Sequence, residues 1–138
     1  MHFILYADGG SRGNPGPAGA GALVRDEEGT QVVTVSEFLG IATNNIAEYT
    51  AVVRALEGLQ KLLGAQSVHA VVEARLDSQL VVRQMNGAYK IKHPNIVPLA
   101  RRVQELSQSF KSVAFVHVYR EDNKEADALA NSAMDQGH

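Results

Sequence analysis

The sequence predicts a mixed α/β fold, in which helices cover a sheet of parallel and antiparallel strands. Three apolar runs separated by short turns fill residues 3–38, an order that indicates an antiparallel meander. From residue 45 onward the apolar residues recur at helical spacing, and strands and helices then alternate along the chain. The expected order is βββαβαβα, and 138 residues suit a single domain over 1–138.

The first three strands are expected over residues 3–7, 18–25 and 30–38. Residues 30–38 alternate polar and β-branched side chains with the period of two that is typical of a strand. Between the first two strands, residues 9–17 contain four glycines, which permit backbone conformations that other residues resist. We expect this stretch to be a flexible loop that leaves room for a bulky ligand close to the main chain.

The long helix is expected to run from Asn45 to Leu63, with Gly64 as its C-cap. The later elements are expected to be a strand over 68–76, a short helix over 78–85, a helix from Pro98 to about Phe110 and a strand over 112–119. A last helix opens at 121–123, and its spacing places Ala126, Leu129, Ala130 and Ala133 on one face.

Composition and charge exclude several classes of protein. The chain has no cysteine, which excludes disulfides and thiolate zinc sites and suits a reducing cytoplasm. We see no signal peptide at the N-terminus and no apolar run near the roughly 18 residues of a membrane span. With a net charge of −2, nucleic acid would have to be bound by a local patch or by cations that acidic residues hold. No extended apolar surface stripe is apparent, so a monomer is expected.

Four carboxylates stand at expected element ends: Asp8 after the first strand, Glu48 in the first turn of the long helix, Asp77 between a strand and a helix, and Asp127 in the first turn of the last helix. Each has a structural alternative. Asp8 could form a turn, Glu48 could complete a capping box with Asn45, Asp77 could be an N-cap, and Asp127 could answer the helix dipole.

Taken together, the four acids indicate a site. A mixed sheet can gather such strand and helix ends along one edge, where the carboxylates would repel one another unless cations lay between them. Hard oxygen ligands favour Mg²⁺ or Mn²⁺, with phosphate oxygens completing the shell. Two such ions about 3.5–4 Å apart can activate a water and stabilise the leaving oxygen in a phosphoryl displacement.

Four sequence motifs, in this order and at this spacing, resemble the type 1 ribonuclease H family over nearly the whole chain. They are Tyr6-Ala7-Asp8-Gly9-Gly10-Ser11-Arg12-Gly13-Asn14-Pro15-Gly16-Pro17, Thr43-Asn44-Asn45-Ile46-Ala47-Glu48, Asp77-Ser78-Gln79-Leu80, and Arg120-Glu121-Asp122-Asn123-Lys124-Glu125-Ala126-Asp127-Ala128-Leu129-Ala130.

The resemblance implies a ribonuclease H-like fold with a five-stranded mixed sheet, three antiparallel strands being followed by parallel additions. It also implies that Asp8, Glu48, Asp77 and Asp127 hold two Mg²⁺ or Mn²⁺ ions. The implied reaction is hydrolysis of the RNA strand of an RNA–DNA hybrid, which leaves 5′-phosphate and 3′-hydroxyl ends. In the family, the residue at the position of Glu48 also orients the 2′-hydroxyl and the water.

Substrate-binding residues follow from the same resemblance. Thr43 is expected to bind a DNA phosphate, and the basic connector over 89–93 is expected either to track the DNA strand through Lys90 and Lys92 or to be a solvated loop. The residues expected to contact RNA in the minor groove, where 2′-hydroxyls are exposed, are Gly9, Gly10, Ser11, Arg12, Gly13, Asn14, Asn44 and Asn45.

The chain departs from many relatives in ways that resemble the shorter, archaeal-like branch. It lacks the lysine-rich helical handle and the histidine-bearing loop before the last helix. Arg120 is therefore the candidate to face phosphate, the alternative being a surface salt bridge. His117 lies on an alternating strand and is expected to be structural. Ile41 stands where some relatives place a basic residue, which bears on the grip on the DNA strand.

Other functions stay open at this point. A transposase or integrase core uses acids on a similar sheet, but it needs additional DNA-binding segments. A catalytically silent hybrid-binding module is a second alternative, although no expected acid is lost. A two-carboxylate glycosidase would not explain the fourth acid or the Asn-rich and Gly-rich neighbours. The glycine stretch is not a P-loop, because no Gly-Lys-Ser/Thr follows it. Cleavage of double-stranded RNA and a further domain beyond residue 138 are left open.

Overall fold

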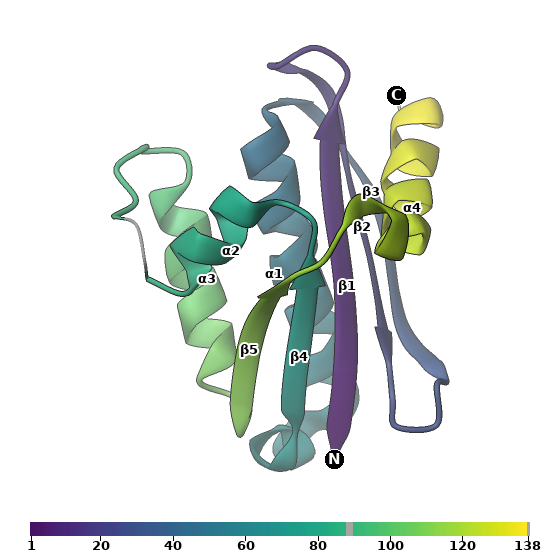
Figure 1. The fold of residues 1–138 in the computed structure, drawn as a ribbon, viewed down its shortest axis with the longest axis vertical. Helices are drawn as coiled ribbons and strands as arrows, with labels where there is room; N and C mark the ends of the chain where they lie inside the picture. Colours follow the sequence, from purple (N-terminus) through teal and green to yellow (C-terminus); the bar gives the residue numbers. More distant parts are fainter. Residues whose placement is uncertain (88–89, 138) are drawn as a thin grey trace.

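A computed structural model describes residues 1–87 and 90–137 of the chain. Five strands form one mixed sheet in the order β3-β2-β1-β4-β5, in which β1, β2 and β3 are antiparallel while β4 pairs parallel to both β1 and β5 (Figure 1). The predicted fold class is therefore confirmed. The strands are β1 (His2–Ser11), β2 (Gly16–Arg25), β3 (Gln31–Ala42), β4 (Val71–Leu76) and β5 (Ser112–His117).

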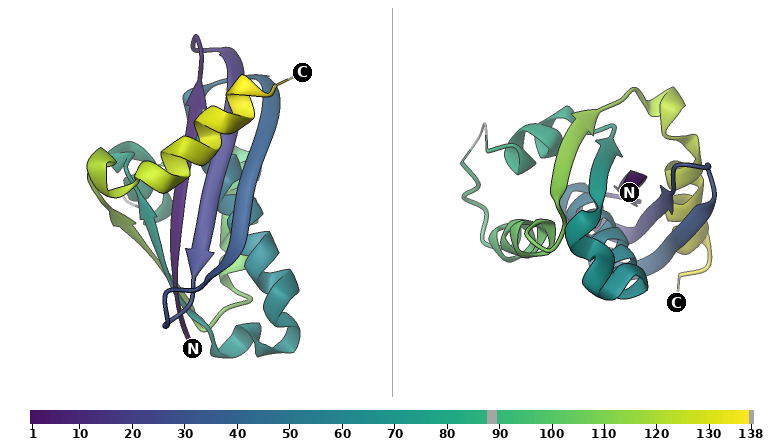
Figure 2. Two further views of the ribbon diagram at one scale, coloured as in Figure 1. Left: turned by 90° about the vertical axis from the view of Figure 1, so that its right-hand side faces the viewer. Right: turned by 90° about the horizontal axis from the view of Figure 1, so that it is seen from below.

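Helices cover both faces of this sheet. Helix α1 packs on one face with α3 beside it, and α4 crosses the opposite face over β1, β2 and β3 (Figure 2). In the described residues, no helix has both the length and the apolar character that a membrane span requires. The helices are α1 (Asn44–Leu63), α2 (Gln79–Met85), α3 (Val97–Ser107) and α4 (Lys124–Asp135), with short 3-10 helices η1 (Gly64–His69) and η2 (Arg120–Asp122).

Strand β1 divides its side chains between the two helical layers. Leu5 and Ala7 are buried in the core beneath α1, and Gly9 continues this row against the backbone of α1. Asp8 and Gly10 alternate with them and therefore face the layer of α4, where Gly10 lies against the side chain of Met134. Asp8 thus stands on the opposite face of the sheet from the main core.

Helix α4 lies unusually close to β2 because both partners carry small residues there. A Cβ atom on Gly21 would lie 2.3 Å from the carbonyl oxygen of Ala126 and 2.4 Å from the amide nitrogen of Ala130. The predicted face of this helix is confirmed, since Ala126, Ala130 and Ala133 are buried. Leu129 on the same face is half-buried.

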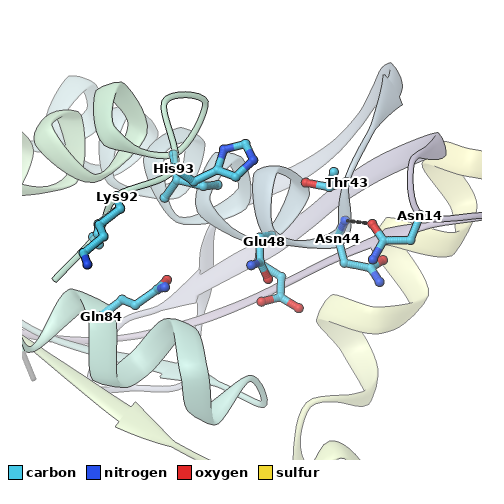
Figure 3. Close-up of a pocket in the computed structure, with 10 residues that line it drawn as sticks. Asn14, Thr43, Asn44, Glu48, Gln84, Lys92 and His93 are labelled. Atoms are coloured by element: carbon cyan, nitrogen blue, oxygen red, sulfur yellow. Dashed lines mark hydrogen bonds between the residues drawn. The ribbon is translucent and has the colours of Figure 1, made fainter. Parts of the chain in front are cut away.

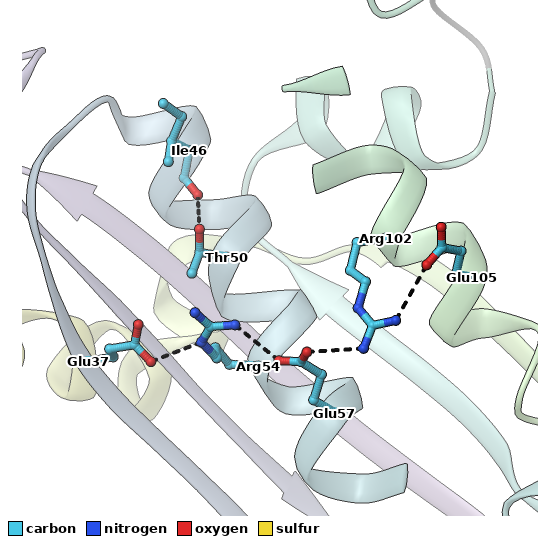
Figure 4. Close-up of polar contacts among 7 residues, drawn as sticks. All are labelled: Glu37, Ile46, Thr50, Arg54, Glu57, Arg102 and Glu105. Atoms are coloured by element: carbon cyan, nitrogen blue, oxygen red, sulfur yellow. Dashed lines mark hydrogen bonds and ion pairs between the residues drawn. The ribbon is translucent and has the colours of Figure 1, made fainter. Parts of the chain in front are cut away.

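Ion pairs join α1 to its neighbours on the surface. Arg54 pairs with Glu37 of β3 and with Glu57, both at 3.0 Å, and Arg102 of α3 reaches Glu57 at 3.2 Å and Glu105 at 3.4 Å (Figure 4). All five side chains keep substantial exposure, so each pair contributes at most about 1 kcal/mol. These contacts fix the position of α1 less than its buried apolar face does.

Several predicted element bounds were wrong. The glycine stretch is mostly strand, because residues 8–11 pair with residues 18–21 and β2 already begins at Gly16. The stretch before β4 is a 3-10 helix over 64–69, so the strand does not start at Val68. Helix α3 ends at Ser107 instead of Phe110, and β5 ends at His117. Gly64 does cap α1, with a φ of 55°.

Candidate active site

The parallel register of β1 and β4 brings Asp8 and Asp77 side by side. Ala7 of β1 pairs with Leu76 of β4, and the residue that follows each of them is an aspartate. Strand β1 continues to Ser11, and the prediction that Asp8 ends its strand was therefore wrong. Asp77 is not the N-cap of α2 either, because Ser78 fills that position and accepts a hydrogen bond from the amide of Val81 at 3.3 Å.

Glu48 reaches the same place from α1. The N-cap of this helix is Thr43, whose hydroxyl accepts a hydrogen bond from the amide of Ile46 at 3.2 Å. Glu48 consequently lies beyond the first turn, and both its predicted place in that turn and the capping box with Asn45 were wrong. Because Gly9 has no side chain, the backbone of α1 can approach β1 closely enough for Glu48 to stand beside Asp8.

Asp127 lies in the first turn of α4, as predicted. It lines one pocket of about 300 Å³ together with the other three acids and with Arg120, which comes from η2. The remaining lining residues come from the tip of β1 and from α1 and α4; they are Gly9, Gly10, Ser11, Arg12, Asn44, Ala130, Asn131 and Met134.

Burial and the charges of neighbouring carboxylates make Asp8 and Glu48 hard to ionise. The pKa of Asp8 is raised to about 8, and burial is the largest cause. The charge of Asp77 is the next cause, followed by a hydrogen bond with Asp127 and by the charges of Asp127 and Glu48. Burial also raises the pKa of Glu48 to about 7; a hydrogen bond with Ser78 opposes the shift and the charge of Asp77 adds to it. The pocket therefore favours any positive charge that can lie among these oxygens.

The donor set fits a hard divalent cation. The Oε2 atom of Glu48 is buried and has no hydrogen-bond partner within the described chain, so it is an acceptor that a cation would satisfy. Among residues 1–87 and 90–137, no three acidic, histidine or cysteine side chains already enclose an ion-sized site. The four carboxylates thus suit an ion that takes its other ligands from water or phosphate, as Mg²⁺ does.

A second pocket shares Asn44 and Glu48 with the acidic one. Figure 3 shows the residues that line this second pocket. Its volume is about 460 Å³. The side chains of Thr43 and Lys92 come from the start of α1 and from the connector before α3. The other lining residues are Asn14, Asn45, Gln84, Ile91, His93 and Ile96.

Hydrogen bonds orient two asparagine side chains at the junction of the two pockets. The amide of Ser11 donates to Oδ1 of Asn44 at 2.8 Å, and the amide of Asn44 donates to Oδ1 of Asn14 at 3.1 Å. Both side-chain oxygens are thereby engaged by the backbone. The Nδ2 groups of Asn14 and Asn44 are donors that can bond to a ligand.

Some predicted residues lie elsewhere. Lys90 is exposed and lines neither pocket, and Tyr89 lies outside the described residues. His117 is exposed at the end of the edge strand β5, with its ring centroid 5.9 Å from that of Tyr119, and it lines neither pocket. Ile41 is 72% exposed.

The sequence analysis did not assign several lining residues. Asn131 follows Asp127 by four on a helix, so helical spacing alone could have placed both on one face. Gln84 follows Asp77 by seven and lines the second pocket, where its Oε1 accepts a hydrogen bond from the buried Tyr49 at 3.0 Å. His93 also lines that pocket and was predicted only as part of the basic connector.

The sheet order and the acids gathered where β1 and β4 lie side by side define the ribonuclease H-like class of α/β proteins. The family described as Reverse transcriptase-like matches residues 6–133. Ribonuclease HI of Halobacterium salinarum is 42% identical over 130 residues, which are 94% of this chain and 63% of that protein. The chain belongs to the type 1 ribonuclease H family.

Other relatives agree in sequence and in structure. The bifunctional protein Rv2228c of Mycobacterium tuberculosis is 43% identical over 136 residues, or 98% of this chain, and the chain spans only 36% of that protein's length. The crystal structure of LC11-RNase H1 in complex with an RNA/DNA hybrid superposes with a TM-score of 0.90 at 44% identity and 97% coverage of both chains. The RNase H1 structure from Halobacterium salinarum has a TM-score of 0.89 at 39% identity, covering 99% of this chain and all of that one.

Proposed function

We propose that the protein is an endoribonuclease that hydrolyses the RNA strand of RNA–DNA hybrids with Mg²⁺ or Mn²⁺. The observation that carries the proposal is that four carboxylates and Arg120 line one pocket. This pocket shares Asn44 and Glu48 with a second pocket. The hybrid complex of LC11-RNase H1, at 44% identity, supports the choice of substrate. Like the family it resembles, the enzyme would leave 5′-phosphate and 3′-hydroxyl ends.

The two pockets suit the two strands of a hybrid. The RNA strand would follow the acidic pocket, along Gly9, Gly10, Ser11 and Arg12 at the tip of β1. The DNA strand would pass the second pocket, where Thr43 and Lys92 can meet a phosphate and Asn45 contributes to the wall, with Lys90 exposed nearby in the chain.

The asparagine pair supports recognition of RNA in the minor groove. Because the backbone holds both side-chain oxygens, Asn14 and Asn44 would present N–H donors. The minor groove offers base acceptors and 2′-hydroxyls, and the 2′-hydroxyl distinguishes RNA from DNA. Glu48 lines both pockets, and we expect it to accept a hydrogen bond from a 2′-hydroxyl on the RNA strand.

Asp8, Glu48, Asp77 and Asp127 would hold two ions, which when bound supply a nucleophilic water and stabilise charge on the phosphate. Asp8 and Glu48 must release their protons to serve as ligands, and this requirement ties cation binding to their raised pKa values. Arg120 adds a cation at the pocket wall that can neutralise a phosphate oxygen.

A labelled RNA–DNA hybrid incubated with and without a chelator tests the proposal. The expected result is cleavage of the RNA strand that the chelator abolishes, and no cleavage by Asp8→Asn. RNA left intact by the wild-type chain at every metal concentration would leave a catalytically silent hybrid-binding module. A parallel arm with double-stranded RNA tests for the side activity.

The proposal also includes a single domain over 1–138, a monomer and a location in the cytoplasm. One sheet shared by all five strands, with helices on both faces, supports the single domain. The absence of cysteine suits a reducing compartment. Size-exclusion chromatography with light scattering tests the monomer.

A further inference from the structure

The residue that links most of the candidate site is Asn123, which is not one of the four acids. It lies between η2 and α4, and its side chain is 1% exposed. Its Nδ2 group donates to the carbonyl oxygen of Ala7 at 2.9 Å and to Oδ2 of Asp77 at 3.2 Å. One amide group therefore bridges the residue that precedes Asp8 and the carboxylate of Asp77.

The backbone of Asn123 contacts two further residues of the site, Arg120 and Asp127. Its amide donates to the carbonyl oxygen of Arg120 at 3.0 Å, and its carbonyl oxygen accepts a hydrogen bond from the amide of Asp127 at 3.1 Å. Strand β1, the end of β4, η2 and the first turn of α4 thus meet at this single residue. Displacement of Asn123 would move Asp77, Asp127 and Arg120 relative to Asp8.

The other half of the same amide indicates why an asparagine stands there. Its Oδ1 atom is buried and has no hydrogen-bond partner within residues 1–87 and 90–137. An unpaired buried acceptor costs about 1–3 kcal/mol, so this side chain is not the choice that stability alone would favour. The two donor bonds from Nδ2 are what the position gains in exchange.

We propose that Asn123 is a positioning residue that fixes the carboxylate of Asp77 and the start of α4 for cation binding. The hydrogen bond to Oδ2 restricts rotation of the Asp77 carboxylate, which lines the pocket together with Asp8 and Asp127. The proposal rests on the proposed function, because it assigns to Asn123 a role in the same cation site.

The test compares Asn123→Leu with Gln60→Leu. Leucine preserves the approximate shape at 123 and removes both donor bonds. Gln60 donates from Nε2 to Oγ of Ser109 at 2.7 Å, so its variant removes a hydrogen bond between elements that lies outside both pockets. Mn²⁺ binding is measured by calorimetry without hybrid, folding by urea denaturation in chelator, and kcat and KM with a labelled hybrid.

Asn123→Leu is expected to weaken Mn²⁺ binding about 10–100-fold and to lower kcat by a similar factor, as is usual when a residue that orients a metal ligand is lost. KM for the hybrid should stay unchanged, because the strand-binding side chains lie elsewhere. Gln60→Leu should lose stability without a change in Mn²⁺ affinity. A folded Asn123→Leu variant with wild-type Mn²⁺ affinity would overturn the inference.

A measurement on the wild-type chain covers the case in which Asn123→Leu does not fold. The side-chain amide resonances of Asn123 should be protected from exchange and should shift as Mg²⁺ is added, and resonances that do not respond would overturn the inference. Since binding is measured without hybrid, a wild-type chain that binds Mn²⁺ but cleaves nothing would refute the proposed function alone. A chain that binds no Mn²⁺ would refute both.

Discussion

Gly9 of β1 lies directly against the peptide group that joins Ala47 to the next residue of α1. A Cβ atom at position 9 would stand 2.2 Å from the carbonyl carbon of Ala47 and 2.3 Å from the amide nitrogen of Glu48. No side chain fits in that space without moving the helix or the strand. The approach of α1 to the carboxylate of Asp8 therefore depends on this one glycine.

Gly9→Ala should destabilise the fold by about 1–3 kcal/mol and lower cleavage, because the added methyl group overpacks the contact with α1 and moves Glu48 away from Asp8. Gly10→Ala is the matched comparison, since its methyl group would meet only the flexible end of Met134, at 3.2 Å. Urea denaturation and cleavage assays measure both variants. Equal stability of the two would contradict the tight contact at Gly9.

Asp8→Asn should stabilise the protein in chelator at alkaline pH. Folded Asp8 has a pKa of about 8 against an ordinary value of 3.8, so the folded chain binds more protons between these values and its stability falls as pH rises through them. Asparagine cannot ionise, and the gain near pH 8 should be roughly 1 kcal/mol or more. Urea denaturation of the wild type and of Asp8→Asn at acidic and alkaline pH tests this prediction. A difference in the free energy of unfolding that does not change with pH would refute it.

Mg²⁺ should stabilise the protein more at about pH 8 than at about pH 6, because the ion must displace protons from Asp8 and Glu48. At a concentration of 100 times Kd the stabilisation amounts to about 2.7 kcal/mol. Thermal denaturation with and without Mg²⁺ at the two pH values measures the effect. Removal of Asp8 by the Asn substitution should reduce both the shift and its pH dependence.

Arg120→Ala should lower the single-turnover rate of hybrid cleavage by about tenfold or more, as expected for a lost charge-assisted hydrogen bond of 1.5–3 kcal/mol. Arg120→Lys should keep part of the rate because it keeps the charge. Arg101, which is exposed on α3 away from both pockets, is the control arginine. A full rate in Arg120→Ala would return Arg120 to the role of a surface residue.

Asp135→Asn should tighten hybrid binding. Nη2 of Arg12 lies 2.6 Å from Oδ1 of Asp135, so the acid neutralises a cation at the pocket wall. Both side chains are exposed, and the change in stability should stay below about 1 kcal/mol. Binding is measured in the Asp8→Asn background at low and high salt, and the gain should shrink at high salt.

Glu125→Gln provides the matched control for that experiment. Glu125 pairs with Arg25 at 2.6 Å, outside both pockets, and its substitution removes the same charge from α4. An equal gain in binding from the two variants would show that net charge acts, and not the release of Arg12.

The sequence predicted the elements whose periodicity is strong and the acids that carry the motifs. Asp8 and Asp77 do lie side by side, but the strand that continues past Asp8 was missed. Its glycines form a ladder only because β2 supplies partners, and pairing across strands is not visible in local propensity. The choice of Thr43 over Asn45 as N-cap likewise depended on where the preceding strand β3 ends.

Asn123 was predicted only as part of a helix start. Its contacts with Ala7 and Asp77 span 116 and 46 residues of sequence. Such distant hydrogen bonds are set by how η2 meets the sheet, and no spacing rule of a single helix or strand predicts them. The division of the binding surface into two pockets that share Glu48 is a tertiary property of the same kind.

The docking of α4 on Gly19 and Gly21 has a consequence for the order in which the chain becomes competent during synthesis. Three of the four acids lie within residues 8–77, but Asp127 comes from α4, which packs on β1, β2 and β3. Translation proceeds from the N-terminus. A nascent chain whose residues beyond 123 are still inside the ribosome therefore presents only three of the four acids. Under the proposed function, the cation site is therefore complete only after the last helix has emerged from the ribosome.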